Sequence, residues 1–586
     1  MLLALTVGVA GAALVGGAGP AVGAGTGAGG APGAYRVVPL RFTVEAGGRR
    51  CAVDADLYRP LAVDAAHPAP AVLATNGFGG SKSDGTTDAI GRALASRGYV
   101  ALVYSGLGFG RSGCLISLDD PRVDGAAASR LVDFLAGTRA ADDGTRVDFV
   151  VRDGAGDPRV GMVGGSYGGA VQLATAAVDP RLDALVPLIT WHDLAHSLAP
   201  NAAGPATPGV FKWQWANGFY LMGEGQPLLV PSFDPSRINS LGCLHFVTDA
   251  CATVRLLNSG SYPDAATRKV LDYARSVSPV SYLDRVKAPT LLVQGQADSL
   301  FTLNEARASY ERLAGRGVKT GMIWQSWGHS GGQAPGELDL SRGDLTASYV
   351  GRRILGWFDR YLRRDPGADT GPAFAYYRDW GSGYATADAV PALSRTLYLS
   401  GDGTLTGSRA QVVRGTRAYL NWPLATSHSE SPAARFLGLP DPAPYDLPGT
   451  FLAWRSAPLT GPAELVGAPR ATLRVSSPAA ERVQGSGDAA DKLVLFAKLY
   501  DVAPDGGRTL VHRLVAPVRV PDVTRPFTVE LPGIVHRYET GHRLEFVIAA
   551  SDTAYFGNRG MKLVTVSSAP GETGTLELPL VRGRVG

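Results

Sequence analysis

Two serines in this sequence lie in the pattern Gly-x-Ser-x-Gly, which can place a serine hydroxyl on a tight turn. They are Ser166 in GGSYGG and Ser330 in GHSGG. Because the chain contains 75 glycines, the pattern alone does not select either serine. A serine hydroxyl is a weak nucleophile at neutral pH, so catalysis needs a base within hydrogen-bond reach and a group that orients the base. The segments around each serine must therefore distinguish them.

These flanking segments favour Ser166 as the nucleophile. The apolar run VGMVG before it predicts a strand and GAVQLATAA after it predicts a helix, which is the context of a nucleophile elbow. Ser330 also follows a predicted strand, but Pro335 stands where a helix would have to continue. The alternative interpretation is that Ser166 belongs to a tight strand–helix turn of a non-catalytic α/β domain.

The order of residues along the chain selects a base and an acid. In α/β-hydrolases the order is serine, then acid, then histidine. Of the nine histidines, only His329 in WGHSGG follows both the nucleophile and the region at about 191–284, where we expect a cap, and precedes the β-rich region 372–586. Asp298 follows the predicted buried strand TLLVQG, at the end of the strand where open α/β sheets bind ligands. The sequence therefore predicts a Ser166, Asp298, His329 triad.

A tetrahedral intermediate also needs hydrogen-bond donors for its oxyanion. We expect one to be the backbone N–H of Tyr167, which follows the nucleophile at the start of the predicted helix. The second is expected from the glycine-rich loop TNGFGGSKSD (75–84), with the N–H of Phe78 as the donor. The alternative for this loop is a glycine turn without a catalytic role.

Three regions of different character follow one another along the chain. From 35 to 365, predicted strands alternate with predicted helices, which indicates a mostly parallel sheet covered by helices. Between about 191 and 284 this alternation is interrupted, and we expect a cap over the site. From 372 to 586, β-rich segments joined by turns predict a separate all-β sandwich.

The N-terminus has the features of a secretory signal. Residues 1–24 are apolar and end in Val22-Gly23-Ala24, and 25–34 form a glycine-rich leader that we expect to be flexible. No Lys or Arg precedes the apolar stretch, so we expect either that the true start lies upstream or that the signal is atypical. A retained membrane anchor is the alternative, but the interspersed glycines and Pro20 weaken it as a stable span. We therefore expect a secreted, extracellular protein.

The four cysteines suggest disulfides in such an exported chain. They allow three connectivities, of which we favour Cys243–Cys251, because it closes a short loop, with Cys51–Cys114 as its complement. Four free buried thiols are the alternative. The spacing of the cysteines is not that of a zinc site.

No feature of the sequence indicates a metal, a cofactor or a nucleic-acid partner. His192 and His196 are four residues apart, a spacing found in zinc sites, but no third ligand is evident, and we expect a hinge or hydrogen-bonding role. The chain has 56 basic and 52 acidic residues, and no basic run long enough to follow a phosphate backbone. The partner we expect is a small peptide or ester substrate; the sequence does not determine the oligomeric state.

Taken together, these features resemble a known family, the serine hydrolases that group X-Pro dipeptidyl-peptidases with cocaine-esterase-like acylases. The similar segments are GGSYGG, SPVSYLDRVKAPTLLVQGQADSLF (278–301), WGHSGG, SAPLTGPAELVGAPRATLRVSS (456–477) and GHRLEFVIAAS (541–551). The resemblance covers nearly all of the mature chain. It implies an α/β-hydrolase domain with a helical cap, followed by a jelly roll similar to galactose-binding modules that helps to shape the active-site wall.

One position departs from the family pattern. Members often use a tyrosine hydroxyl after an Asn-Pro pair in the oxyanion hole, whereas the matching stretch here is Asn76-Gly77-Phe78. Phenylalanine has no hydroxyl, so this chain must use backbone donors or stabilise the oxyanion less.

The resemblance and the expected export favour the removal of short N-terminal peptides, that is, a dipeptidyl-peptidase or related exopeptidase. Such an enzyme must also bind the substrate ammonium, through a residue that the sequence does not identify. An esterase or amidase without that requirement is the first alternative. An exported glycan-binding protein with an inert hydrolase domain is the second.

Overall fold

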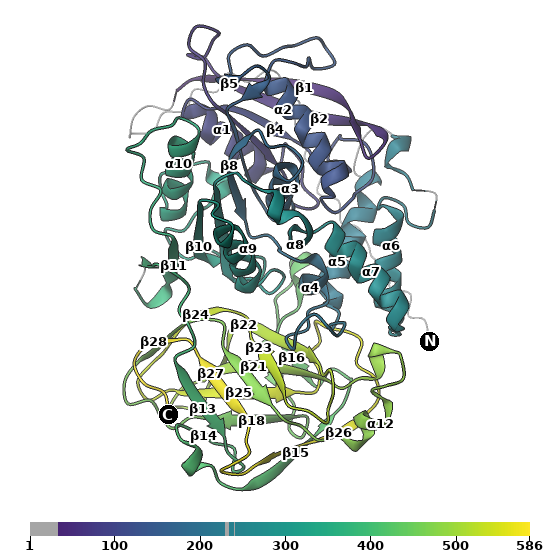
Figure 1. Ribbon diagram of the computed structural model, residues 1–586, viewed down its shortest axis with the longest axis vertical. Helices are drawn as coiled ribbons and strands as arrows, with labels where there is room; N and C mark the ends of the chain where they lie inside the picture. Colours follow the sequence, from purple (N-terminus) through teal and green to yellow (C-terminus); the bar gives the residue numbers. More distant parts are fainter. Residues whose placement is uncertain (1–32, 229–233, 240, 382) are drawn as a thin grey trace.

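The computed structural model describes residues 33–228, 234–239, 241–381 and 383–586. The predicted signal peptide (1–24) and nearly all of the predicted leader (25–34) lie outside these residues. The described chain forms an α/β part followed by an all-β part, stacked along the long axis of the molecule (Figure 1). This arrangement confirms the predicted fold class. None of the described helices is long and apolar enough to cross a membrane.

A mixed sheet is the centre of the N-terminal part. Among the described residues it contains ten strands, in the order β1-β2-β4-β3-β7-β8-β9-β10-β11-β12. Their bounds are β1 Tyr35–Ala46, β2 Arg49–Pro60, β3 Ala71–Thr75, β4 Val100–Tyr104, β7 Val160–Gly165, β8 Leu182–Leu188, β9 Thr290–Ala297, β10 Thr320–Trp327, β11 Phe374–Arg378 and β12 Gly383–Ala387. The strands from β4 to β11 in this order pair in parallel, so the loops that follow them meet at one edge of the sheet.

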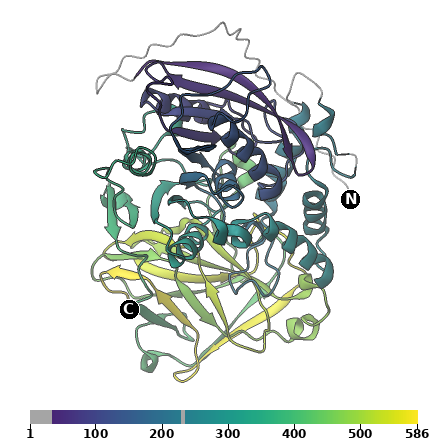
Figure 2. The ribbon, with the colours of Figure 1, turned by 45° about the horizontal axis from the view of Figure 1, so that its top comes forward.

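Both faces of this sheet are covered, as its continuous apolar strands require. The long antiparallel β1–β2 pair forms one end of the sheet (Figure 2). Alternate residues of a strand enter opposite cores: Leu73 packs with one set of helices and Val72 with another. The first set is α2 Ala126–Leu135 and α3 Tyr167–Ala176, and the second is α1 Gly85–Ser96 and α10 Tyr349–Tyr361.

The interval between β8 and β9 holds the helices of the expected cap. They are α4 Leu194–Leu198, α5 Trp213–Gly225, α6 Thr248–Ser259, α7 Asp264–Ser276 and α8 Pro279–Tyr282. A disulfide joins Cys243, which precedes α6, to Cys251 within α6, with Cα atoms 6.0 Å apart. A second disulfide joins Cys51 on β2 to Cys114 in the segment after β4, with Cα atoms 5.5 Å apart.

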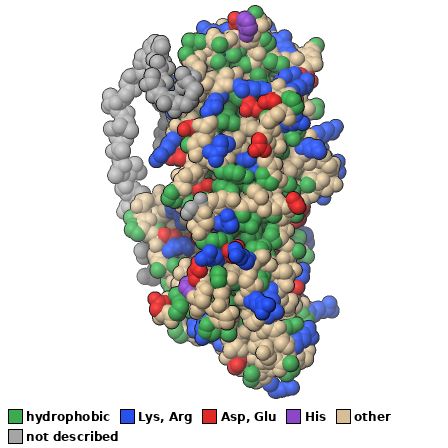
Figure 3. All heavy atoms as spheres, turned by 90° about the vertical axis from the view of Figure 1, so that its left-hand side faces the viewer, with side chains coloured by type: hydrophobic (Ala, Val, Ile, Leu, Met, Phe, Trp, Pro, Cys, Tyr) green, Lys and Arg blue, Asp and Glu red, His purple; other side chains and the backbone are tan. Residues whose placement is uncertain are grey.

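The C-terminal part is built from antiparallel sheets that enclose their own apolar core. One sheet has the order β14-β13-β27-β20-β23, with β14 Leu405–Thr406, β13 Arg395–Leu399, β27 Thr575–Leu578, β20 Arg470–Leu473 and β23 Phe527–Glu530. Another has the order β18-β25-β21-β22, with β18 Phe451–Arg455, β25 Arg543–Ala549, β21 Val494–Val502 and β22 Arg508–Arg519. A third pairs β19 Ala463–Gly467 with β24 Ile534–Tyr538 and β28 Leu580–Arg582. On the face shown in Figure 3, basic and acidic side chains of the described residues are intermixed.

The turn between β7 and α3 packs directly against the end of β3. A Cβ added at Gly168 would lie 2.5 Å from the carbonyl oxygen of Thr75 and 3.0 Å from that of Asn76. A Cβ at Gly164 would lie 2.7 Å from the carbonyl oxygen of Gly168. Backbone atoms fill this space, and they cannot move aside as the end of a flexible side chain can. Glycine at these two positions therefore determines how closely the turn approaches β3.

We expect Gly168→Ala to destabilise the protein by about 1–3 kcal/mol, because the added methyl group overpacks the backbone of Thr75. Gly315→Ala is the matched control, since Gly315 ends the helix α9 Leu303–Gly315 and a Cβ there would meet nothing within 4 Å. That change should leave stability equal or slightly higher. Denaturant unfolding of both variants is the measurement; equal midpoints for Gly168→Ala and the native chain would contradict the close packing.

Candidate active site

Ser166 lies on the sharp turn between β7 and α3 with φ 57° and ψ −117°. A positive φ is uncommon for a residue other than glycine and persists only where the surroundings impose it. Here the Ser166 N–H donates to the Leu188 carbonyl at 2.8 Å, and its own carbonyl accepts from the N–H groups of Gly169 and Ala170. The side chain is thereby presented at the carboxyl end of the sheet, as the elbow prediction requires.

Asp298 and His329 follow the neighbouring parallel strands β9 and β10 and meet Ser166 at this edge of the sheet. His329 Nδ1 lies 2.7 Å from Asp298 Oδ2, and His329 Nε2 lies 3.0 Å from Ser166 Oγ. The Asp298 side chain is fully buried, and its Oδ1 accepts from the Phe301 N–H at 2.8 Å. The structure thus brings the three predicted residues together in hydrogen-bonding geometry suited to proton transfer.

A cavity of about 670 Å³ opens beside the serine. Gly77 and Phe78 line it together with Ser166, and a Cβ at Gly77 would lie 3.6 Å from the Gly165 carbonyl oxygen. Tyr167 is the first residue of α3, where backbone N–H groups have no partner within the helix. Both predicted oxyanion donors therefore belong to segments that adjoin Ser166.

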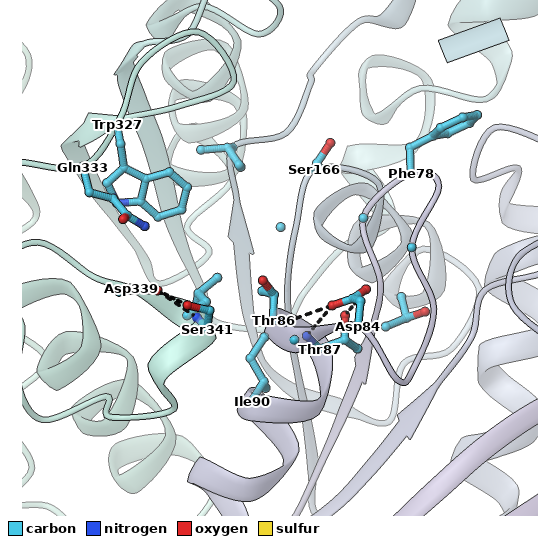
Figure 4. A pocket seen from close by; sticks show the side chains of 17 residues that line it. Phe78, Asp84, Thr86, Thr87, Ile90, Ser166, Trp327, Gln333, Asp339 and Ser341 are labelled. Atoms are coloured by element: carbon cyan, nitrogen blue, oxygen red, sulfur yellow. Dashed lines mark hydrogen bonds between the residues drawn. The ribbon is translucent and has the colours of Figure 1, made fainter. Parts of the chain in front are cut away.

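The ring of Phe78 points away from Asp84, Thr86 and Ser341, which form the polar end of this cavity (Figure 4). It packs edge-to-face against Phe109, Tyr167 and Phe219, with ring centroids 5.0, 5.6 and 5.3 Å away. Aromatic pairs at these distances and angles are stabilising beyond the area that they bury. The ring of Phe78 thus ties the loop after β3 to the cap through Phe219 of α5.

Aromatic side chains also surround the histidine. Phe301 and Trp215 contact the His329 ring edge-to-face, with centroids 5.2 and 6.2 Å away. Trp215 in turn packs on Phe436 of the C-terminal part, 5.6 Å away. Sequence reasoning did not single out these residues, since an isolated aromatic in a cap or a loop carries no local pattern that indicates an active site.

Two carboxylates lie at the polar end of the cavity, and both are already hydrogen-bonded. Asp84 caps α1 and accepts from the N–H groups of Thr86 and Thr87 at 3.1 and 2.7 Å, and from the Ser81 N–H at 3.1 Å. Asp339 accepts from the N–H and hydroxyl of Ser341 at 3.0 and 2.6 Å. Their positions are seen in Figure 4.

The histidine pair of the expected cap lies apart from the triad and makes structural hydrogen bonds. His196 Nδ1 lies 2.9 Å from Glu305 Oε1, and His192 Nδ1 lies 3.0 Å from Ser309 Oγ. Burial would raise the pKa of Glu305, but its hydrogen bond and ion pair with His196 lower that pKa to about 2. Within the described ranges, no group of three or more His, Cys, Asp or Glu side chains is arranged to hold a metal ion.

The sequence matches two family models. The model for the X-Pro dipeptidyl-peptidase (S15 family) matches residues 48–331, and the model for the X-Pro dipeptidyl-peptidase C-terminal non-catalytic domain matches residues 367–566. No curated protein matches the sequence.

Solved hydrolase structures share this fold over nearly the whole chain. An α-amino acid ester hydrolase has 18% identity and a TM-score of 0.64, and the match covers 93% of this chain and 96% of that protein. An aminopeptidase from the marine sediment archaeon Thaumarchaeota archaeon has 15% identity and a TM-score of 0.62, with coverage of 93% and 97%. A CocE/NonD family hydrolase from Staphylococcus aureus has 15% identity and a TM-score of 0.61, with 94% of each chain covered. At such identities the likeness shows the fold alone.

The two family models together span the α/β part and most of the all-β part, and the chain belongs to the X-Pro dipeptidyl-peptidase (S15) family of serine hydrolases.

Proposed function

We propose that Ser166, His329 and Asp298 are the catalytic triad of a hydrolase that works through an acyl-enzyme. The observation that carries this proposal is the continuous pair of contacts from Asp298 Oδ2 to His329 Nδ1 and from His329 Nε2 to Ser166 Oγ, at 2.7 and 3.0 Å. His329 takes the proton of the Ser166 hydroxyl as its oxygen attacks the substrate carbonyl carbon, and gives it to the leaving group as the scissile bond breaks. Water then repeats the sequence and releases the acid.

The oxyanion formed in each step would accept hydrogen bonds from the backbone N–H groups of Tyr167 and Phe78. The position of Tyr167 at the start of α3 and the contact of Gly77 with the turn support this assignment. Backbone donors would replace the tyrosine hydroxyl that Phe78 lacks.

Short peptides are the substrate class that family membership supports, with release of an N-terminal dipeptide as the reaction. Disulfides at Cys51–Cys114 and Cys243–Cys251 support an oxidising compartment and hence the proposed secretion.

An ester or amide substrate without a free amine is the second candidate, and the surroundings of Ser166 favour it. The side chains next to Phe78 and His329 are aromatic. The carboxylates of Asp84 and Asp339 are engaged by backbone and hydroxyl donors, so an ammonium group would have to compete with those bonds.

Ser166→Ala should abolish labelling by a fluorophosphonate probe, because the probe reacts with an activated serine oxygen. Asp298→Asn should keep the labelling site but lower kcat by about 10⁴-fold, since the imidazole is then held in the wrong tautomer. Ser486→Ala, on the surface of the all-β part, is the control and should label as the native chain does. Labelling that persists in Ser166→Ala would refute the nucleophile assignment.

A panel of dipeptidyl p-nitroanilides, their N-acetylated forms and p-nitrophenyl esters would separate the two substrate classes. A dipeptidyl-peptidase should lose most of its kcat/KM on N-acetylation, because the ammonium contact disappears. An esterase or amidase should cleave acetylated and free substrates equally and prefer the esters. Absence of turnover on the whole panel, together with glycan binding by the protein, would instead favour an inert hydrolase domain.

A further inference from the structure

One carboxylate of the C-terminal part reaches the loops that carry the proposed acid and base. Glu430 lies between the short strand β16 Ser427–His428 and the helix α11 Pro432–Phe436, and it is 2% exposed. Its Oε1 accepts hydrogen bonds from the Ser299 hydroxyl and from Trp215 Nε1, the latter at 3.1 Å. Glu430 therefore contacts the residue next to Asp298 and a cap residue that packs on His329.

Ser299 is also bonded to the loop of the histidine. Its N–H donates to Ser330 Oγ at 3.0 Å, and the two hydroxyl oxygens lie 2.6 Å apart. Trp215 Nε1 donates to the Ser299 hydroxyl at 3.0 Å. Because Ser299 follows Asp298 and Ser330 follows His329, these bonds join the two loops directly beside the Asp298–His329 contact.

A second side chain of the same segment supports the histidine loop. Arg435 Nη1 donates to the His329 carbonyl oxygen at 3.3 Å, and Arg435 Nη2 lies 3.7 Å from Glu430 Oε2. Segment 428–436 of the all-β part thus contacts both loops, one through Glu430 and the other through Arg435.

The burial of Glu430 is costly, which makes its position informative. Burial raises the pKa of this carboxyl, against the opposing effect of its hydrogen bonds to Ser299 and Trp215. Its Oε2 has no hydrogen-bond partner among the described residues. An apolar side chain of similar volume would avoid the desolvation of a carboxylate. An apolar side chain could not, however, accept hydrogen bonds from both Ser299 and Trp215.

We propose that Glu430 is a positioning residue of the proposed triad: the C-terminal part acts through it to hold Ser299 and Ser330, and hence Asp298 and His329, in register. This inference rests on the function proposed above. Loss of these hydrogen bonds would shift the Asp298–His329 pair but not the surface that binds the acyl group. It should therefore slow proton transfer more than it weakens substrate binding.

Glu430→Ala removes the acceptor from Ser299 and Trp215. The rate constant of fluorophosphonate labelling and kcat for p-nitrophenyl butyrate should both fall by about 10–100-fold, the effect of a small misplacement of catalytic groups. KM should change little. Glu430→Gln retains a carbonyl oxygen at the same place and should restore most of the loss.

Glu545→Ala is the matched control. Glu545 is an equally buried glutamate of the same part, but its partners are Arg455 and Arg508 of the all-β part. Its removal should lower the unfolding midpoint and leave the labelling rate constant of the folded protein unchanged. Comparison of the two variants separates the positioning of the proposed triad by Glu430 from general destabilisation.

Ser299→Ala tests the other end of the contact and carries the test if Glu430→Ala does not fold. It should lower kcat with little change in KM, and where Glu430→Ala folds, adding that change to Ser299→Ala should have less effect than in the native background, since the two changes interrupt one bond. If the native chain labels at Ser166 while Glu430→Ala and Ser299→Ala label at the native rate, the positioning role is overturned. If the native chain itself fails to label, the proposed triad is overturned instead.

Discussion

The contact between the β7–α3 turn and the end of β3 is a constraint on which the rest of the site depends. Only backbone atoms meet there, so no side chain can adjust the distance between the turn and β3. The same contact brings Gly77 and Phe78 beside Ser166 and holds the serine at a positive φ. A backbone conformation that is unfavourable in isolation is thereby maintained by packing.

The proposed acid and base, Asp298 and His329, depend on a different kind of support. Strands β9 and β10 place Asp298 and His329 at the correct edge of the sheet, but the residues that follow them are in loops. Buried polar groups from other regions hold these loops. Lys212 Nζ, from the cap, donates to the carbonyl oxygens of Ser299 and Leu300 at 2.5 and 2.9 Å, and burial lowers the pKa of Lys212 to about 8. Glu430 approaches Ser299 from the all-β part. The segment after Asp298 is therefore held from two sides by ionisable side chains that are costly to bury and directional once paired.

Much of the fold and the central site could be predicted because their signals are local. Apolar runs of strand length mark the central strands, and the strand–glycine–serine–glycine–helix context marks Ser166. Chain order then leads to Asp298 and His329, which the structure places within hydrogen-bonding distance of each other and, through His329, of Ser166. Glu430 and Phe436 were not predictable in this way. Glu430 lies in a loop and Phe436 ends the short helix α11, both in the all-β part, and Glu430 meets its partner Ser299 131 positions away. Nothing in the residues around Glu430 differs from an ordinary polar loop.

The sequence also does not determine where a side chain points. It predicts a role only for the backbone N–H of Phe78, yet the ring of Phe78 packs in an aromatic cluster with Phe219 of the cap. The amino-acid sequence by itself determined the types of the elements, the residues of the proposed triad and the order in which they follow one another, because hydrophobic periodicity and turn chemistry act between near neighbours. Only the tertiary structure decided which buried carboxylate contacts the loop after Asp298 and which aromatic rings pack on His329. Those choices depend on the packing of remote segments, where a buried polar group is stable only if a partner from elsewhere in the chain arrives at hydrogen-bonding distance.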